Sequence, residues 1–131
     1  MTVIMSDRDR ASLEVKKAKT KIVPHLEGDQ LKVNIETKIE GTLADNMTKE
    51  EFNEAYLNKV EKKISQEVEK LMLSSLTKLQ ELETDITDFG LIIHQRSPQE
   101  WKRVQPKWDA IFANAEVKID VKALNFGRAF V

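Results

Sequence analysis

The side chains that most often carry out catalysis or bind metals are scarce in this chain. It contains two histidines, His25 and His94, about 70 residues apart, and no cysteine. Without cysteine there are no disulfides, thiolate zinc ligands or cysteine nucleophiles, and two distant imidazoles do not make up the three or four ligands of a zinc site. No strained G-x-S-x-G turn accompanies His94 to suggest a serine nucleophile. We therefore expect packing or surface roles for both histidines, and a hydrolase using His94 is the weakest hypothesis.

Four carboxylates, Glu81, Glu83, Asp85 and Asp88, gather in a short segment. They lack the D-x-[DN]-x-[DN]-G spacing and the distal glutamate of a calcium loop. We interpret them as a solvated helix end, with Asp88 at or near the N-cap of the next helix, where carboxylates are favoured. Asp88 also opens an Asp-Phe-Gly tripeptide, but the glycine-rich and H-R-D loops of a kinase are absent. The sequence thus predicts no catalytic, cofactor-binding or metal site, and a protein that is not an enzyme.

Both tryptophans follow within a segment that has strong helix signals. Ser97-Pro98-Gln99-Glu100 combines a capping box with proline at the first helical position, so a helix is predicted to begin there. Trp101, Val104, Trp108, Ile111 and Phe112 then share one helical stripe. An aromatic stripe at this spacing usually packs in a core, so we favour core anchors over ligand-stacking residues. Pro106 interrupts the stripe and predicts a kink or two short helices in tandem. The predicted structural corner comprises Phe89, Gly90, Ser97, Pro98, Trp101, Trp108 and Phe112.

The elements around this corner follow from hydrophobic periodicity. Residues 11–43 predict two strands joined by a turn at Gly28-Asp29, and residues 31–43 alternate apolar and polar side chains with period two. From the capping box at Thr48 and Glu51, apolar residues then recur every three to five positions up to about Glu83, which predicts one long amphipathic helix. After the corner, residues 117–123 alternate again as a third strand.

These elements predict an α+β domain with the order β-β-α-(short α)-β. We expect a mostly antiparallel sheet of about three to four strands under the long helix, with short capped helices at the tryptophan-containing corner. Residues 1–10 read as a tag remnant or linker, and residues 11–131 as a single domain, since 131 residues suffice for one core. The net charge of -1 gives no long-range field for nucleic acid. No apolar run approaches the length of a membrane span.

The corner and its flanking elements resemble the C-terminal domain of the C-subunit lipoproteins of spore nutrient germinant receptors, the Ger(x)C family. The likeness spans roughly residues 12–131, including the alternating strand "LKVNIETKIEG" and the Lys/Glu-rich helix after it. Its most specific residues are Asp85-Ile86, Phe89-Gly90, Pro98-Gln99-Glu100-Trp101, Trp108, Phe112 and the strand Val117-Lys118-Ile119-Asp120-Val121.

The resemblance implies a non-enzymatic interaction domain of a germinant-receptor C subunit that supports the nutrient response triggering germination. It implies integral membrane A- and B-type subunits as partners, and a location at the outer face of the spore inner membrane. This chain departs from the family in lacking a signal peptide and a lipid-accepting cysteine. Any membrane attachment is therefore expected through a lipid anchor outside this chain, which would be the C-terminal domain of a larger lipoprotein. The alternative hypothesis is a small-ligand or lipid-binding domain with a pocket between helix and sheet.

Overall fold

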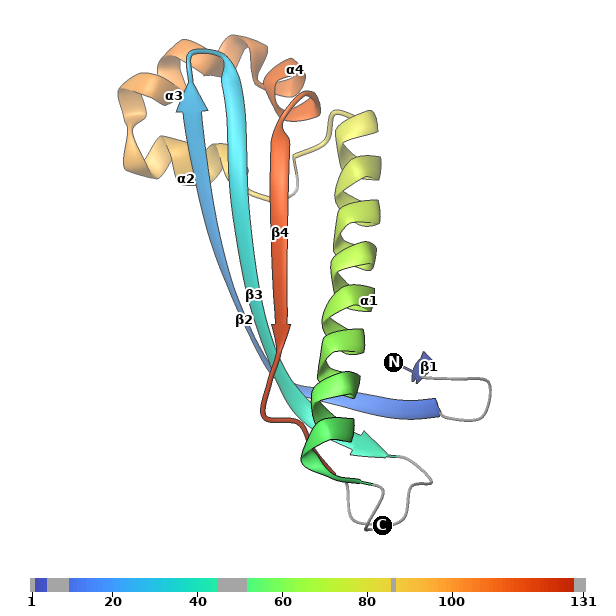
Figure 1. The fold of residues 1–131 in the computed structure, drawn as a ribbon. Helices are drawn as coiled ribbons and strands as arrows, with labels where there is room; N and C mark the ends of the chain where they lie inside the picture. Colours follow the sequence, from blue (N-terminus) through green and yellow to red (C-terminus); the bar gives the residue numbers. More distant parts are fainter. Residues whose placement is uncertain (1, 5–9, 45–51, 86, 129–131) are drawn as a thin grey trace. The chain divides into compact units, whose positions relative to one another are not determined.

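The structure, a computed structural model, describes residues 2–4, 10–44, 52–85 and 87–128. Figure 1 shows the elements in order along the chain. They are β1 (Thr2–Ile4), β2 (Arg10–Glu27), β3 (Gln30–Ala44), α1 (Glu54–Glu81), α2 (Phe89–Arg96), α3 (Pro98–Val104), the 3-10 helix η1 (Gln105–Lys107), α4 (Trp108–Ala113), β4 (Glu116–Ala123) and β5 (Gly127–Arg128). The predicted α+β class is therefore confirmed.

The strands form one sheet in the order β1-β2-β3-β4, with β5 also paired to β3. β1 is antiparallel to β2, with Thr2 opposite Ser12, and β2 and β3 are joined by the two-residue turn at Gly28-Asp29. Gly28 takes a positive φ of 63° there, a conformation that glycine adopts without steric cost. β5 is parallel to β3, and Figure 1 draws β4 pointing the same way as β3. The longest ladder, between β2 and β3, is antiparallel, so the mostly antiparallel sheet is confirmed.

The chain forms two compact units, and the long elements contribute to both. Unit 1 contains Met1–Thr20, Glu36–Lys70 and Asp120–Val131, and unit 2 contains Lys21–Ile35 and Leu71–Ile119. The predicted period-two pattern holds in each, because every odd-numbered residue of β3 from Leu31 to Leu43 is buried.

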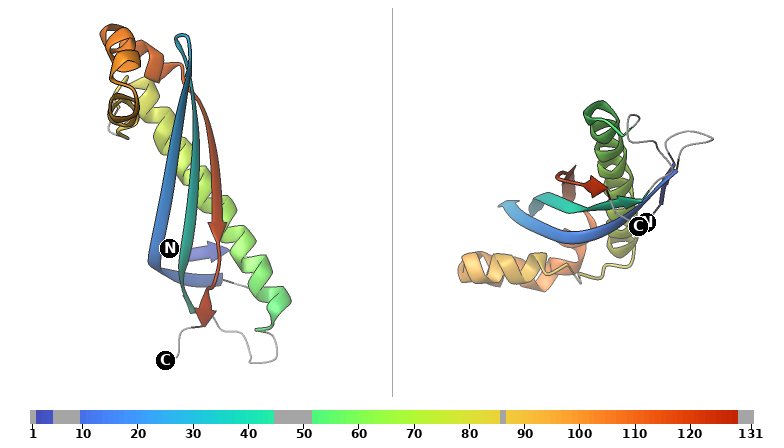
Figure 2. Two further views of the ribbon diagram at one scale, coloured as in Figure 1. Left: turned by 90° about the vertical axis from the view of Figure 1, so that its left-hand side faces the viewer. Right: turned by 90° about the horizontal axis from the view of Figure 1, so that it is seen from below.

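Unit 1 packs the first half of α1 on the sheet. Val60 and Ile64 are fully buried on the helix side, against a sheet side that includes the buried Ile39 and Val121. Ser65 accepts a hydrogen bond from the backbone N–H of Ala123 at 2.9 Å, so the helix is also tied to β4. Figure 2 shows β1, in dark blue beside the N-terminal mark, next to the first part of β2.

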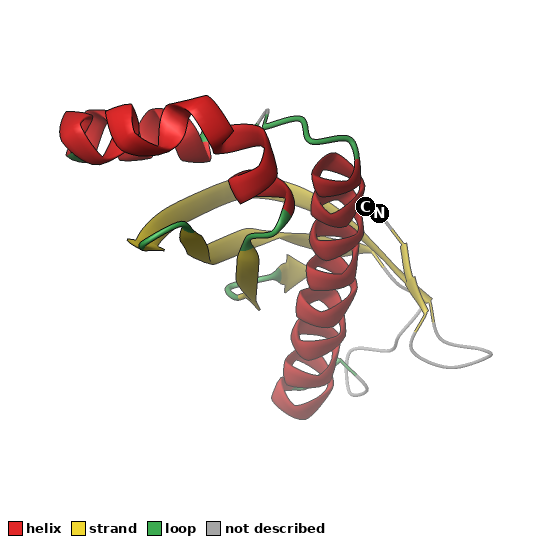
Figure 3. Ribbon diagram, turned by 90° about the horizontal axis from the view of Figure 1, so that it is seen from above, coloured by secondary structure: helices red, strands yellow, loops and turns green. Residues whose placement is uncertain are grey.

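Unit 2 holds the second part of α1 and the short helices. Figure 3 shows α2, α3 and α4 lying on one side of the strands. Their buried side chains form the core of this unit with Leu31 and Val33 of β3 and Leu76 of α1. The buried residues that the short helices supply are Phe89, Ile93, Val104, Trp108, Ile111 and Phe112.

Two predicted helix starts have different outcomes. Ser97 caps α3, accepting a hydrogen bond from the backbone N–H of Glu100 at 3.4 Å, with Pro98 at the first helical position. The predicted start of the long helix at Thr48 was wrong, because α1 begins at Glu54. There the Asn53 side chain accepts a hydrogen bond from the backbone N–H of Tyr56 at 2.9 Å. The capping box at Thr48 lies outside the described residues. Asparagine is among the most favoured N-cap residues, so Asn53 is as suitable a cap as threonine.

The prediction for Pro106 is confirmed, because the helical stripe divides into α3, η1 and α4 around it. Proline lacks the N–H of an α-helical ladder, and a short 3-10 segment accommodates it. Three residues of the segment interpreted as a tag remnant or linker form β1. The origin of residues 1–10, and the assignment of 11–131 to a single domain, stay predictions. Within the described residues, no helix has the length and apolar character required to cross a bilayer.

Candidate functional site

The corner is organised around the carboxyl group of Asp85. Its Oδ2 accepts hydrogen bonds from the N–H of Gly90 at 3.0 Å and from Nε1 of Trp108 at 2.9 Å. Its Oδ1 accepts from the hydroxyl and the N–H of Thr87 at 2.6 and 3.2 Å, and from the N–H of Phe89 at 3.4 Å. One carboxyl group thus satisfies the first turn of α2 and orients an indole of α4 from 23 residues away.

The hydrogen bonds that a carboxylate makes at the start of α2 therefore come from Asp85 and not from Asp88. Asp88 does occupy the N-cap position of α2, but its side chain makes no capping hydrogen bond and its φ is 63°. Aspartate is one of the few residue types that tolerate this left-handed conformation. The predicted position of Asp88 at the N-cap is therefore confirmed, but the capping hydrogen bonds come from Asp85.

Gly90 allows both tryptophans to pack against α2. A Cβ at this position would lie 2.9 Å from ring atoms of Trp101 and 3.1 Å from Trp108. The two indoles meet edge to face, with centroids 5.3 Å apart, and Phe89 and Phe112 meet at 5.8 Å. Phe89 and Phe112 are completely buried and Trp108 is 7% exposed, whereas Trp101 is only half-buried. The structure therefore brings together the aromatic residues of the predicted corner, with Ser97 and Pro98 at the start of α3.

The two histidines lie at different places in unit 2, and both are exposed. The His94 ring stacks on Trp101 with centroids 5.9 Å apart, and His25 lies 3.5 Å from a carboxylate oxygen of Glu27. In the part of the chain that the structure describes, no three His, Asp or Glu side chains are placed to hold a metal ion.

The hairpin turn is held by two cations that sequence reasoning did not single out. Arg103 donates to Oδ1 of Asp29 at 3.0 Å and to the carbonyl oxygen of Gly28 at 2.8 Å. Lys107 donates to Oδ2 of Asp29 at 2.6 Å. The hydrogen bond from Lys107, together with the charges of both cations, holds the pKa of Asp29 below its ordinary value. These exposed contacts fasten the β2–β3 turn to the helices of unit 2.

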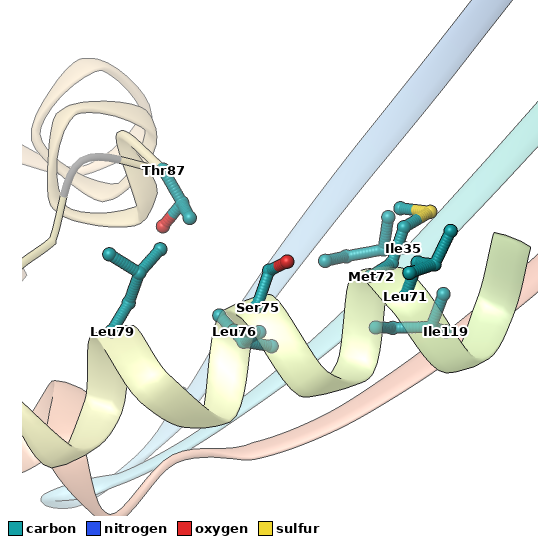
Figure 4. Close-up of a pocket in the computed structure, with 8 residues that line it drawn as sticks. All are labelled: Ile35, Leu71, Met72, Ser75, Leu76, Leu79, Thr87 and Ile119. Carbon is teal, nitrogen blue, oxygen red and sulfur yellow. The ribbon is translucent and has the colours of Figure 1, made fainter.

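Unit 2 contains an apolar groove of about 310 Å³, shown in Figure 4. The helix α1 contributes Leu71, Met72, Ser75, Leu76 and Leu79 to its lining. The sheet contributes Ile35 from β3 and Ile119 from β4, and the segment before α2 contributes Thr87. We refer to these eight residues as the α1 groove.

Figure 4 shows how the α1 groove runs along the helix. Thr87 faces Leu79 at one end, while Ile35, Met72 and Ile119 gather near Leu71 at the other. Leu76, Ile35 and Ile119 are buried and form its floor, whereas Leu71 is 59% exposed at its rim. The groove is therefore open to solvent along an aliphatic floor. The sequence indicated apolar periodicity in α1, β3 and β4 but not that these residues would meet around an open space.

A comparison with known protein families identifies the chain. Residues 1–124 match the family described as "Spore germination B3/ GerAC like, C-terminal". Because the match covers nearly the whole sequence, the chain belongs to this family of spore-germination domains, and the resemblance noted from the corner residues is confirmed.

Individual relatives agree with this assignment. The chain is 32% identical over 121 residues to spore germination protein B3 of Bacillus subtilis (strain 168), covering 88% of this chain and 32% of that protein. It is 27% identical over 124 residues to spore germination protein KC of the same organism, covering 92% of this chain and 30% of that protein. The crystal structure of the GerBC protein superposes with a TM-score of 0.83 at 28% identity, over 96% of this chain and 39% of that one. The chain therefore spans about a third of the length of the relatives it matches.

Proposed function

We propose that this chain is a non-enzymatic interaction domain of a germinant-receptor C subunit and supports the nutrient response that triggers germination. The observation that carries the proposal is the family match over residues 1–124. The relatives that it resembles are named as spore germination proteins, and the chain corresponds to one part of each.

The partners in this proposal are the integral membrane A- and B-type subunits of the receptor. The location is the outer face of the spore inner membrane, with attachment through a lipid anchor elsewhere in the full-length lipoprotein. The arrangement of unit 2 supports an interaction role, because the carboxylates Asp85 and Asp29 make structural hydrogen bonds. Asp85 orients an indole and caps a helix, and Asp29 fastens a turn.

The proposal extends to the corner, whose aromatic residues we assign to packing rather than to ligand stacking. Trp108 lies within the core and donates its indole N–H to Asp85. Trp101 is half-buried, and its outer side is covered by the His94 ring. Replacement of His94 by alanine should leave germination unchanged, and a loss of germination in stably folded protein would restore a functional role for that histidine.

The receptor role is tested in spores whose C subunit has been shortened by deletion of this domain. The nutrient-triggered fall in optical density is expected to be strongly impaired, while germination triggered by high pressure or a surfactant that bypasses the receptor proceeds. The retained part of the subunit is followed by immunoblot, so that degradation is recognised. A normal nutrient response in spores that contain the truncated subunit would contradict the proposal.

The α1 groove favours a second candidate function, the binding of a small ligand or lipid between helix and sheet. It lies between α1 and two strands, where the alternative sequence hypothesis placed a pocket, and its volume is at the lower end of about 300–1,000 Å³ for ligand sites. A thermal-stability screen against nutrients and lipids tests it. A ligand well above its dissociation constant raises Tm by mass action, and a flat response across the panel would contradict it.

A further inference from the structure

We infer that the α1 groove binds a single uncharged alkyl chain. This inference rests on the second candidate function and names its class of ligand. It is carried by three properties of the groove: an aliphatic floor, the absence of ionisable side chains from its lining, and a length that suits a chain rather than a compact ring.

The floor and walls supply apolar contacts almost exclusively. Leu76, Ile35 and Ile119 are buried, and Met72 adds a flexible side chain that adapts to the shape of a ligand. Six of the eight lining residues are aliphatic, and the other two are Ser75 and Thr87. Transfer of an alkyl chain from water to such a surface is favourable in proportion to the area that it buries.

The charge of the lining selects against ionised ligands. Among the described residues, no lysine, arginine or histidine lines the groove, so a carboxylate placed there has no cation in this lining to offset the loss of its hydration. The hydroxyl group of Ser75 can hydrogen-bond to a neutral polar end group, and the Thr87 oxygen, whose hydrogen is donated to Asp85, can accept from an alcohol. The preferred ligand is therefore a chain with an alcohol or ester end, not a fatty acid anion or an amino acid.

The length of the groove sets the length of the chain. Leu71 and Leu79 lie eight residues apart on α1, which at 1.5 Å per residue corresponds to about 12 Å, the reach of roughly eight to ten methylene groups. Binding of a series from butan-1-ol to decan-1-ol should tighten by roughly two- to fourfold per added carbon, because each buried methylene contributes to transfer out of water. The gain is expected to level off once the chain exceeds the groove.

The test is calorimetric titration of the complete chain with octan-1-ol and with octanoate, in the wild type and in two matched variants. Ser75→Leu fills the groove from an exposed helical position and is expected to abolish octanol binding. Ser74→Leu adds the same side chain one residue earlier, where the position is exposed but does not line the groove, and should leave binding unchanged. Leucine favours a helix more than serine does, so neither variant should unfold the protein.

Two arms separate the sources of such a chain. If the protein sediments with phosphatidylcholine vesicles and Ser75→Leu abolishes this sedimentation as it abolishes octanol binding, the alkyl chain belongs to a membrane lipid. If the protein binds octanol but does not sediment with vesicles, the alkyl chain belongs to a free aliphatic molecule. The inference is overturned if octanoate binds as tightly as octanol, if affinity does not depend on chain length, or if Ser74→Leu and Ser75→Leu behave alike. A polar nutrient that stabilises the protein where octanol does not would leave ligand binding standing and refute the alkyl class. The receptor role is decided separately, by germination.

Discussion

The hydrogen bond between Asp85 and Trp108 gives the most specific prediction about the corner. Replacing Asp85 with alanine removes the acceptor for the first turn of α2 and for the indole N–H of a buried tryptophan. Loss of a helix cap costs about 1 kcal/mol, and loss of a hydrogen bond to a charged partner costs about 2 kcal/mol. We expect Asp85→Ala to lower the free energy of unfolding by about 3 kcal/mol, a large share of the stability of a domain.

A double-mutant cycle isolates the contact itself. Trp108→Phe keeps an aromatic ring in the core but removes the N–H, and the coupling energy between Asp85→Ala and Trp108→Phe should be about 1–2 kcal/mol. Urea unfolding followed by circular dichroism at 222 nm measures all four proteins without depending on tryptophan fluorescence. Asp88→Asn is the matched control: asparagine tolerates the positive φ at this position and no capping bond is lost, so the change should be below about 0.5 kcal/mol.

The reasoning fails if Asp85→Ala and Asp88→Asn destabilise the protein equally, or if the cycle shows no coupling. Either result would mean that Asp85 does not hold the indole in solution. The related comparison of the two tryptophans follows from burial: Trp108→Ala should cost about 3–5 kcal/mol, and Trp101→Ala less, since that indole is only half-buried.

Further predictions concern the hairpin and the sheet. In Gly41→Ala the new Cβ would overlap the backbone carbonyl oxygen of Glu14, so we expect a loss of about 3 kcal/mol or more in urea unfolding. Gly28→Ala meets no neighbour but carries a positive φ, and should cost about 1 kcal/mol; equal effects of the two would refute the steric argument. Because folding lowers the pKa of Asp29, chiefly through Lys107, its contribution is present above the ordinary pKa of aspartate and is lost as the pH falls through the lowered value. Asp29→Asn should therefore lower Tm at pH 7 and converge with the wild type in strong acid, and a Tm difference independent of pH would contradict this.

Local patterns in the sequence were sufficient for much of the fold. The alternation in β3 predicted its buried face because side chains in a strand alternate between faces, and this holds from Leu31 to Leu43. The capping box at Ser97 predicted the start of α3 because its donor and acceptor lie within four residues. Signals of this kind need no information about distant parts of the chain.

Features set by distant contacts were missed. β1 and β5 have two or three residues each and exist only through pairing with β2 and β3, so neither carries a detectable period. Spacing placed Asp88 correctly at the N-cap of α2, but it did not show that the capping hydrogen bonds come from Asp85, which also accepts from Trp108. The α1 groove likewise needs α1, β3 and β4 in place before Ile35 and Ile119 can meet Leu76.

The central claim, the proposal that this domain mediates interaction of a C subunit with the A- and B-type subunits, is tested most directly by co-purification from spore membranes. A tagged full-length C subunit and the same protein lacking this domain are captured, and the A- and B-type subunits that accompany each are quantified by immunoblot. The proposed function predicts that removal of the domain strongly reduces recovery of both partners while the truncated subunit remains present. Unchanged recovery of both partners would contradict it.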